Sequence, residues 1–171
     1  MTAGSEPSEP LGWGLFAQWH DLIDRGDPRF RPMAKVDDAE EALTRFEADV
    51  RSSMWNMQRH STIDALRDSK GLDANARRKG LELRFILPRR VALRRNPLVS
   101  SHYDHLRLAP VAHPLLIGDR RHVLVGDSTG ETIWASSDPG VVAQAVAFYE
   151  RLWTSAEPAV PEGEDPPFTR R

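Results

Sequence analysis

Residues 112–126 of this chain read AHPLLIGDRRHVLVG, and they carry its strongest structural signal. Two short β-prone runs, residues 114–118 and 122–126, flank the polar triplet Asp-Arg-Arg at residues 119–121. Aspartate is favoured in tight turns because its side chain hydrogen-bonds to nearby backbone amides. The stretch therefore predicts a β-hairpin with a polar turn.

The segments on either side of this hairpin alternate between helical and strand patterns. Asp38, with a Glu three residues later, is typical of a helix start, and so is the pair Asp138 and Pro139. Residues 89–105 are basic and are expected to be irregular. The predicted helices span residues 11–25, 38–50, 61–80 and 138–153, and the further predicted strands span residues 54–57, 81–87, 106–109 and 132–135.

Helices that alternate with strands favour an α/β fold, here a single domain with a mixed β-sheet flanked by helices. The length of 171 residues is typical of one domain. Residues 1–10 and 157–171 are rich in Pro, Glu, Ser and Gly and are predicted to be disordered tails. The folded domain is therefore expected to span residues 11–156.

The composition narrows the classes of function. The chain contains no Cys, which excludes a thiol nucleophile and a cysteine-based zinc site. A formal charge of −2 gives no general attraction to polyanions, so direct nucleic-acid binding is not expected. No secretory signal or bilayer-length apolar run is present, which predicts a cytoplasmic protein without a membrane partner. His102 and His105 lack further clustered ligands, so neither a metal nor another cofactor is predicted.

The hairpin resembles the second half of the phospholipase D signature. That signature is His-x-Lys-x(4)-Asp with a Gly seven residues after the Asp, and Asp119 and Gly126 occupy its last two positions. Together with the helix and strand patterns around it, the hairpin resembles the phospholipase D-like regulatory domain of TrmB-type and LuxR-associated bacterial regulators. Segments that carry this resemblance are RRKGLELR at residues 77–84, LRLAP at residues 106–110 and FYERLW at residues 148–153.

The resemblance covers about residues 36–155 and implies half of a phospholipase D-like fold. It also implies sugars as one ligand class. Such regulators usually carry an attached DNA-binding unit, but no segment of this chain has the pattern left over for one. The expectation is therefore a sensor domain that stands alone.

The two reactive positions of the signature are substituted. The reacting His falls on Ala112 and the Lys on Pro114. Active members of the superfamily use these groups as nucleophile or acid and as a cation for the phosphoryl charge, so the resemblance implies a hairpin without catalysis. Strand alternation predicts that His113 points to the opposite face. A one-residue bulge could re-aim His113, but Leu115 would then stand where the Lys belongs.

Candidate binding residues come from the same framework. Arg84 and Asp119 are candidate contacts for a ligand, and Trp55 and Trp134 lie on predicted strands from which they could stack on one. The alternative for each is an ordinary structural role. The amphipathic first helix could contact another protein or a second copy of the chain, whereas packing on its own sheet is the simpler alternative. Its candidate partner-binding residues are Trp13, Phe16 and Trp19.

These observations predict a non-catalytic sensor or interaction domain of bacterial transcriptional regulation that binds a small molecule or a regulatory protein. Two alternatives stay open. One is a phosphodiesterase-like enzyme with a non-standard site around His113 or His122. The other is a nucleic-acid-associated protein that uses the basic stretch of residues 77–107, in which the spacing shows no interleaved aromatic platform for bases.

Overall fold

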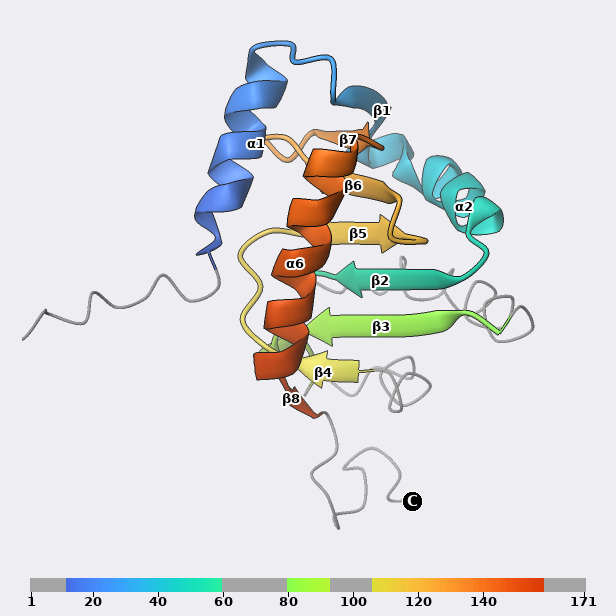
Figure 1. Ribbon diagram of the computed structural model, residues 1–171, viewed down its shortest axis with the longest axis vertical. Coiled ribbons are helices and arrows are strands. Elements are labelled where there is room, and N and C mark those ends of the chain that lie inside the picture. Colours follow the sequence, from blue (N-terminus) through green and yellow to red (C-terminus); the bar gives the residue numbers. More distant parts are fainter. Residues whose placement is uncertain (1–11, 60–79, 93–105, 159–171) are drawn as a thin grey trace, which may run out of the picture.

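The computed structural model describes residues 12–59, 80–92 and 106–158, and its centre is one eight-stranded mixed sheet (Figure 1). The strand order is β1-β7-β6-β5-β2-β3-β4-β8, in which β2, β3 and β4 are parallel and every other pair is antiparallel. The predicted fold class, a single α/β domain with a mixed sheet, is confirmed. The strands are β1 (Arg31–Lys35), β2 (Ser53–Met57), β3 (Glu82–Leu87), β4 (Leu106–Leu108), β5 (Leu115–Gly118), β6 (His122–Gly126), β7 (Thr132–Ser136) and β8 (Glu157–Pro158).

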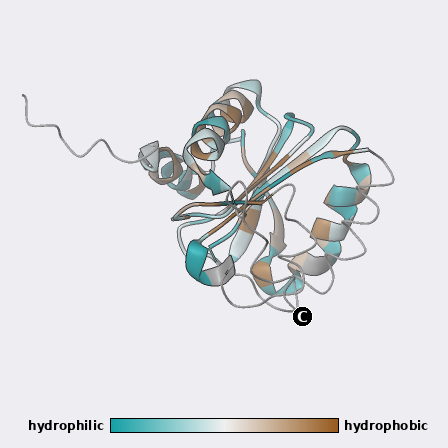
Figure 2. Cartoon of the chain, turned by 90° about the horizontal axis from the view of Figure 1, so that it is seen from below, coloured by the Kyte–Doolittle hydropathy of each residue, from teal (hydrophilic) through white to brown (hydrophobic). Residues whose placement is uncertain are grey.

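Helices lie on both sides of the twisted sheet, as the view along the strands' edges shows (Figure 2). Helices α1 (Gly14–Asp24) and α6 (Pro139–Ser155) pack side by side on one face, and their apolar residues belong to the larger core cluster. Helix α2 (Ala39–Asp49) covers part of the other face, where Leu43 and Phe46 pack on the smaller cluster. The sheet therefore separates two cores of different size.

The predicted hairpin is confirmed as the β5–β6 pair, in which Leu115 lies opposite Val125 and Gly118 opposite His122. Its side chains alternate between the two cores, because successive residues of a strand point to opposite faces. Leu115 belongs to the cluster under α1 and α6, whereas Leu116 belongs to the cluster under α2. This alternation determines on which face of the sheet the side chain of each strand residue of the motif lies.

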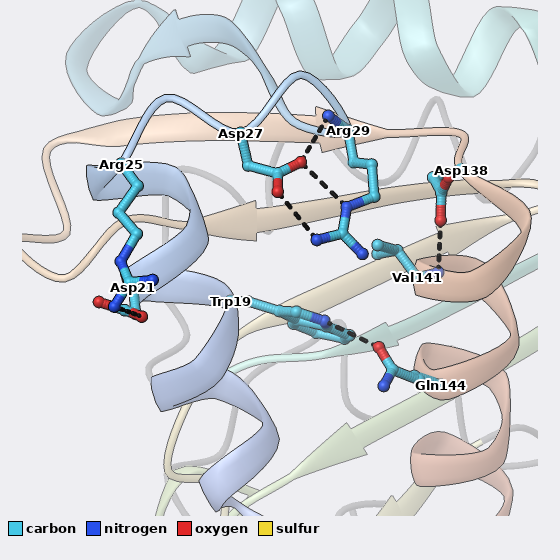
Figure 3. A network of polar contacts seen from close by, with 8 residues as sticks. All are labelled: Trp19, Asp21, Arg25, Asp27, Arg29, Asp138, Val141 and Gln144. Atoms are coloured by element: carbon cyan, nitrogen blue, oxygen red, sulfur yellow. Dashed lines mark hydrogen bonds and ion pairs between the residues drawn. The ribbon is translucent and has the colours of Figure 1, made fainter.

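The two predicted helix caps have different outcomes. Asp138 accepts a hydrogen bond from the backbone N–H of Val141 at 3.0 Å, and Pro139 opens α6, as predicted (Figure 3). The predicted helix start at Asp38 is confirmed, because α2 begins at the next residue, but the Asp38 side chain makes no cap hydrogen bond. Asp38 ends the short 3-10 helix η2 (Val36–Asp38), so its backbone lacks the extended conformation that a capping residue needs.

Three further segments differ from the predictions. The edge strand β1 was not anticipated, because its sequence contains Pro32 and lacks an alternating apolar pattern. The short helix α4 (Arg89–Ala92) lies where an irregular stretch was expected. Glu157 and Pro158 form β8 beside β4 instead of belonging to a tail, and Glu157 also pairs with Arg89. The order in β1 and β8 comes from pairing with β7 and β4, which local sequence does not show.

Several predictions fall outside the described residues. They are the helix at residues 61–80 apart from its last residue, the histidines at 102 and 105, and most of both tails. Gly80, the last residue of that range, has a φ of 68°, a left-handed conformation that glycine adopts readily. Among the described residues, no helix has the length and apolar character needed to cross a membrane.

Candidate functional site

The reactive positions of the motif lie just before β5. Ala112 and Pro114 are both exposed, and His113 between them is half-buried. The His113 ring stacks on Phe16 of α1, with ring centroids 4.9 Å apart, and lies edge-on to His20 at 5.3 Å. His113 therefore faces the α1 side, as strand alternation predicted, and the motif positions themselves carry a methyl group and a pyrrolidine ring.

Asp119 closes the turn of the hairpin onto the start of β2. Its carboxylate accepts hydrogen bonds from the backbone N–H groups of Arg51, Ser52 and Ser53 at 2.7 to 3.2 Å, and from the Ser52 hydroxyl at 2.9 Å. Burial opposes ionisation, but these hydrogen bonds outweigh it and lower the pKa of Asp119 below its ordinary value. The carboxylate oxygens of Asp119 thus accept hydrogen bonds from the protein itself. This matches the ordinary structural role that was the alternative to a ligand contact.

The loop after Gly126 closes in a similar way. Asp127 accepts a hydrogen bond from the Thr129 hydroxyl at 2.8 Å and another from the Glu131 N–H at 3.1 Å. Burial again opposes ionisation, and the hydrogen bonds from Thr129 and the loop amides lower the pKa of Asp127 overall. These polar groups hold the β6–β7 turn.

A row of arginines and tryptophans runs across the α6 face of the sheet. The Arg84 guanidinium lies 4.3 Å from the Trp55 ring centroid and 5.2 Å from that of Trp153. Arg120 lies 4.7 Å from the Trp55 centroid, and Arg107 lies 4.4 Å from that of Trp153. We call these five residues the arginine–tryptophan row. It joins β2, β3, β4, the hairpin turn and α6 through cation–π contacts.

Acidic groups accompany the row. The Arg84 guanidinium lies 2.9 Å from a carboxylate oxygen of Glu82 and 3.3 Å from one of Glu150. Arg107 donates a hydrogen bond to the backbone carbonyl of Trp153 at 2.6 Å. The Arg84 side chain is largely buried, and a buried charge needs a partner of opposite charge. The carboxylates of Glu82 and Glu150 supply it within the protein.

The two candidate stacking residues lie on the same face but are not open platforms. Trp55 is fully buried under Tyr149, Arg84 and Arg120, and Trp134 is half-buried against the larger core. The indole N–H groups of both are buried without a hydrogen-bond partner. Ligand stacking on Trp55 would require these covering side chains to move.

The candidate partner-binding residues of the first helix pack mainly inside the domain. Phe16 and Trp19 are each 1% exposed, and the Trp19 indole donates to Gln144 of α6 at 3.3 Å (Figure 3). The expectation of a partner surface made by these two side chains was wrong, because their apolar area is already buried against α6 and the sheet. Trp13 is half-buried and contacts Phe148 and His113.

Sequence reasoning missed Arg107, Arg120 and His20 as neighbours of the candidate sites. Each lies on a different element from the residue that it contacts. The available sequence signal for these contacts was the alternation of side chains along a strand. It places Trp55 and Arg84 on one face of the sheet once the β2–β3 register is known. Among the residues that the structure describes, no group of three or more His, Asp or Glu side chains could hold a metal ion.

No protein-family model and no curated protein matches this chain. Solved structures do match its fold. TrmBL2, an archaeal chromatin protein with a novel mode of DNA binding, is 16% identical with a TM-score of 0.59, and the match covers 85% of this chain and 60% of TrmBL2. NucT from Helicobacter pylori is 14% identical with a TM-score of 0.56, over 75% of this chain and 99% of NucT. Nuc from Salmonella typhimurium, a phospholipase D family member, is 14% identical with a TM-score of 0.51, and the match covers 68% of this chain and 89% of Nuc.

The chain therefore has a phospholipase D-like fold, as the hairpin predicted. It matches a TrmB-like protein and phospholipase D-like nucleases in architecture, at identities that define the fold alone. The chain spans 60% of the length of TrmBL2. The expectation that nucleic acid is not bound finds no support in this comparison.

Proposed function

We propose that this chain is a non-catalytic phospholipase D-like domain of a regulatory protein, which acts by binding a small molecule or a partner protein. The observation that carries the proposal is the pair of exposed positions Ala112 and Pro114, which lack the imidazole and ammonium groups that the motif uses. Asp119 keeps its position in the motif, and its carboxylate is engaged by the backbone amides of Arg51, Ser52 and Ser53 at the start of β2.

The chemistry of phosphoryl transfer supports this proposal. The nucleophile and the cation act together on one phosphoryl group, and loss of a single electrostatic donor typically lowers the rate by about 10² to 10³. An Ala and a Pro remove both functions at once. His113 does not replace them, because it faces α1 on the other side of the strand.

An assay with bis(4-nitrophenyl) phosphate tests the absence of catalysis. We expect no turnover above buffer by the full chain. The matched variants His113→Ala and His122→Ala address the enzyme alternative, since they remove the two described histidines nearest the hairpin. Turnover that disappears in either variant would establish a non-standard phosphodiesterase site and end the non-catalytic proposal.

Binding is the second part of the proposal. The resemblance to TrmB-type regulators implies sugars, so the first probes are monosaccharides and disaccharides, tested by isothermal titration calorimetry. A saturable heat with one of them supports a sensor. The absence of heat with all of them removes sugars as the ligand class.

Direct nucleic-acid binding is the second candidate function, and the arginine–tryptophan row favours it. Arginines and aromatic rings do alternate along this row in the fold, although they are not interleaved in the basic stretch of the sequence and the Trp55 ring is buried. Similarity in fold to TrmBL2, a DNA-binding protein, points the same way. The alternative predicts a salt-dependent fluorescence anisotropy change with labelled duplex DNA.

Substitutions in the row sharpen that test. Arg107→Gln and Arg120→Gln should each weaken DNA binding. Each should also reduce the slope of the logarithm of the binding constant against the logarithm of the salt concentration by about 1, the amount expected for one phosphate contact. Arg25→Gln is the matched control, because Arg25 is an exposed arginine at the end of α1. Equal binding by all three variants, or none by the wild type, excludes this surface.

A further inference from the structure

A group of charged residues lies at the opposite end of the central strands from the motif positions. The motif positions precede β5, and β5 starts opposite the carboxyl end of β2. Arg120 lies in the turn that follows β5, next to the amino end of β2. Glu82 is the first residue of β3, and in the parallel β2–β3 pair it lies opposite Ser53, the first residue of β2. Arg120 and Glu82 are therefore close to each other in a region that the motif does not reach.

The Glu82 carboxylate bridges two guanidinium groups. One of its oxygens lies 2.9 Å from Nε of Arg84, and the other lies 3.8 Å from Nη2 of Arg120. Both guanidinium groups also lie over the Trp55 ring, at 4.3 and 4.7 Å from its centroid. This end of the arginine–tryptophan row is thus arranged around a carboxylate, which the chain itself supplies.

The bridging carboxylate is held at the protein surface. The side chains of Glu82 and Arg120 are 46% and 53% exposed, whereas the side chain of Arg84 is 18% exposed. An exposed ion pair contributes little to stability, so Glu82 can leave this position at small cost. The two guanidinium groups are then open to another anion.

Arg84 retains an unused hydrogen-bond donor. Its Nη1 atom is buried and lies 3.3 Å from a carboxylate oxygen of Glu150, yet it makes no hydrogen bond. A buried donor without an acceptor costs free energy. An acceptor that reaches this donor therefore gains a charge-assisted hydrogen bond.

The backbone holds Arg120 in a conformation that favours glycine. Asp119 and Arg120 have φ angles of 55° and 54°, and the Arg121 N–H donates to the Gly118 carbonyl at 3.0 Å, as in a two-residue hairpin turn. Glycine is common at the second position of such turns, because it adopts positive φ without steric cost. An arginine in this strained position indicates a role for its side chain.

We propose that Arg84 and Arg120, beside Trp55, form a binding site for a carboxylate group, and that Glu82 occupies this site until a ligand displaces it. Two guanidinium groups offer paired N–H donors that match the planar oxygens of a carboxylate. The carboxylate belongs to a free organic acid or to an acidic side chain of a partner protein. This inference rests on the proposed function and names its ligand class.

NMR of the arginine side chains tests the site directly. Sodium glutarate stands for a free acid and an acetylated tetraglutamate peptide for an acidic partner segment. Each is titrated into the full chain at neutral pH against sodium chloride of matched ionic strength. We expect the Nε–H resonances of Arg84 and Arg120 and the indole N–H of Trp55 to shift saturably with at least one probe, and the tighter-binding probe identifies the source. Arg25, in an exposed pair with Asp21, is the internal control and should not shift.

The exchange with Glu82 gives a prediction of opposite sign to an ordinary loss of contact. Glu82→Gln should strengthen binding of the probe about two- to fivefold, because it removes the carboxylate that competes for the site. Glu41→Gln, which breaks another exposed ion pair, is the matched control and should leave binding unchanged. Unchanged or weaker binding by Glu82→Gln would overturn the exchange.

Variants of the turn separate binding from folding. Arg120→Gly should weaken probe binding about tenfold without lowering the thermal midpoint, since glycine relieves the positive φ. Arg121→Gln, in the same turn, should bind as the wild type does. Absence of saturable shifts with both probes overturns the site and leaves the non-catalytic proposal to its own phosphodiester assay. Shifts produced by duplex DNA and by neither acid would assign the row to nucleic acid and overturn the carboxylate site as well.

Discussion

The carboxylate of Asp119 accepts the backbone N–H of Ser52 at 2.7 Å, across 67 residues of sequence. Together with the Arg51 and Ser53 amides, this contact fastens the turn of the central hairpin to the first residue of β2. Asp119 and the next residue, Arg120, both have positive φ angles, 55° and 54°. The aspartate of the motif therefore has a role in the fold that does not depend on catalysis.

Removal of this carboxylate should destabilise the domain. Asp119→Ala leaves the amides of Arg51, Ser52 and Ser53 without their acceptor, at an expected cost of about 1 to 3 kcal/mol in the free energy of unfolding. Urea denaturation measures it. Asp24→Ala, an exposed control on α1, should change stability by no more than about 0.5 kcal/mol.

The same interaction gives a pH dependence. The pKa of Asp119 is lower in the folded state, so its stabilising contribution is present above the unfolded pKa of 3.8 and is lost as the pH falls through the folded pKa. Unfolding at a series of acidic pH values should show a smaller loss of stability in Asp119→Asn than in the wild type. Parallel curves for the two proteins would contradict the assignment.

Gly118 should tolerate no side chain, whereas Gly126 should accept one. A Cβ at Gly118 would lie 2.8 Å from Phe46 Cζ and 3.0 Å from Val50 Cγ2, but a Cβ at Gly126 would meet nothing within 4 Å. We expect Gly118→Ala to cost about 1 to 3 kcal/mol by overpacking. Gly126→Ala is the matched control and should be close to neutral. Partial recovery by Phe46→Leu in the Gly118→Ala background would confirm the steric cause.

Glu47 should make the protein less stable as the pH rises. Burial of this side chain on α2 raises its pKa from 4.5 to about 7, and one of its carboxylate oxygens is buried without a partner. The folded state binds the proton more tightly, so its stabilising effect is complete below pH 4.5 and is lost as the pH rises through about 7. The loss is up to about 3 kcal/mol.

Thermal unfolding between pH 4.5 and pH 8 measures this effect. Glu47→Gln keeps the size of the side chain and removes its ionisation, so the variant should lose most of this pH dependence and exceed the wild type in stability at pH 8. An unchanged slope in the variant would mean that another group causes it.

Arg84 should not be replaceable by lysine. Its guanidinium stacks against Trp55 and Trp153 while it pairs with Glu82 and Glu150, and an ammonium group cannot make planar stacking and forked contacts together. Arg84→Lys is expected to cost about 1 to 2 kcal/mol and to change the tryptophan fluorescence. Arg45→Lys, in an exposed pair with Glu41, is the control and should have little effect.

Local sequence was sufficient for the elements whose signals lie within a few residues. The hairpin followed from the alternation of β5 and β6 around a polar turn, and α6 followed from Asp138, Pro139 and its apolar spacing. Strand β1 and strand β8 were not predicted, because Pro32 and Pro158 obscure the β pattern and both strands form only by pairing at the two edges of the sheet.

The candidate sites divide in the same way. The sequence by itself determined that the motif has Ala112 and Pro114 in place of its reactive groups, and strand periodicity set His113 on the opposite face. Only the tertiary structure decided that Asp119 binds the start of β2, that Arg84 lies between two tryptophans, and that His20 meets His113. The physical reason is range: turns, caps and alternation act over a few bonds, whereas these contacts depend on how burial of the apolar faces brings distant strands and helices together.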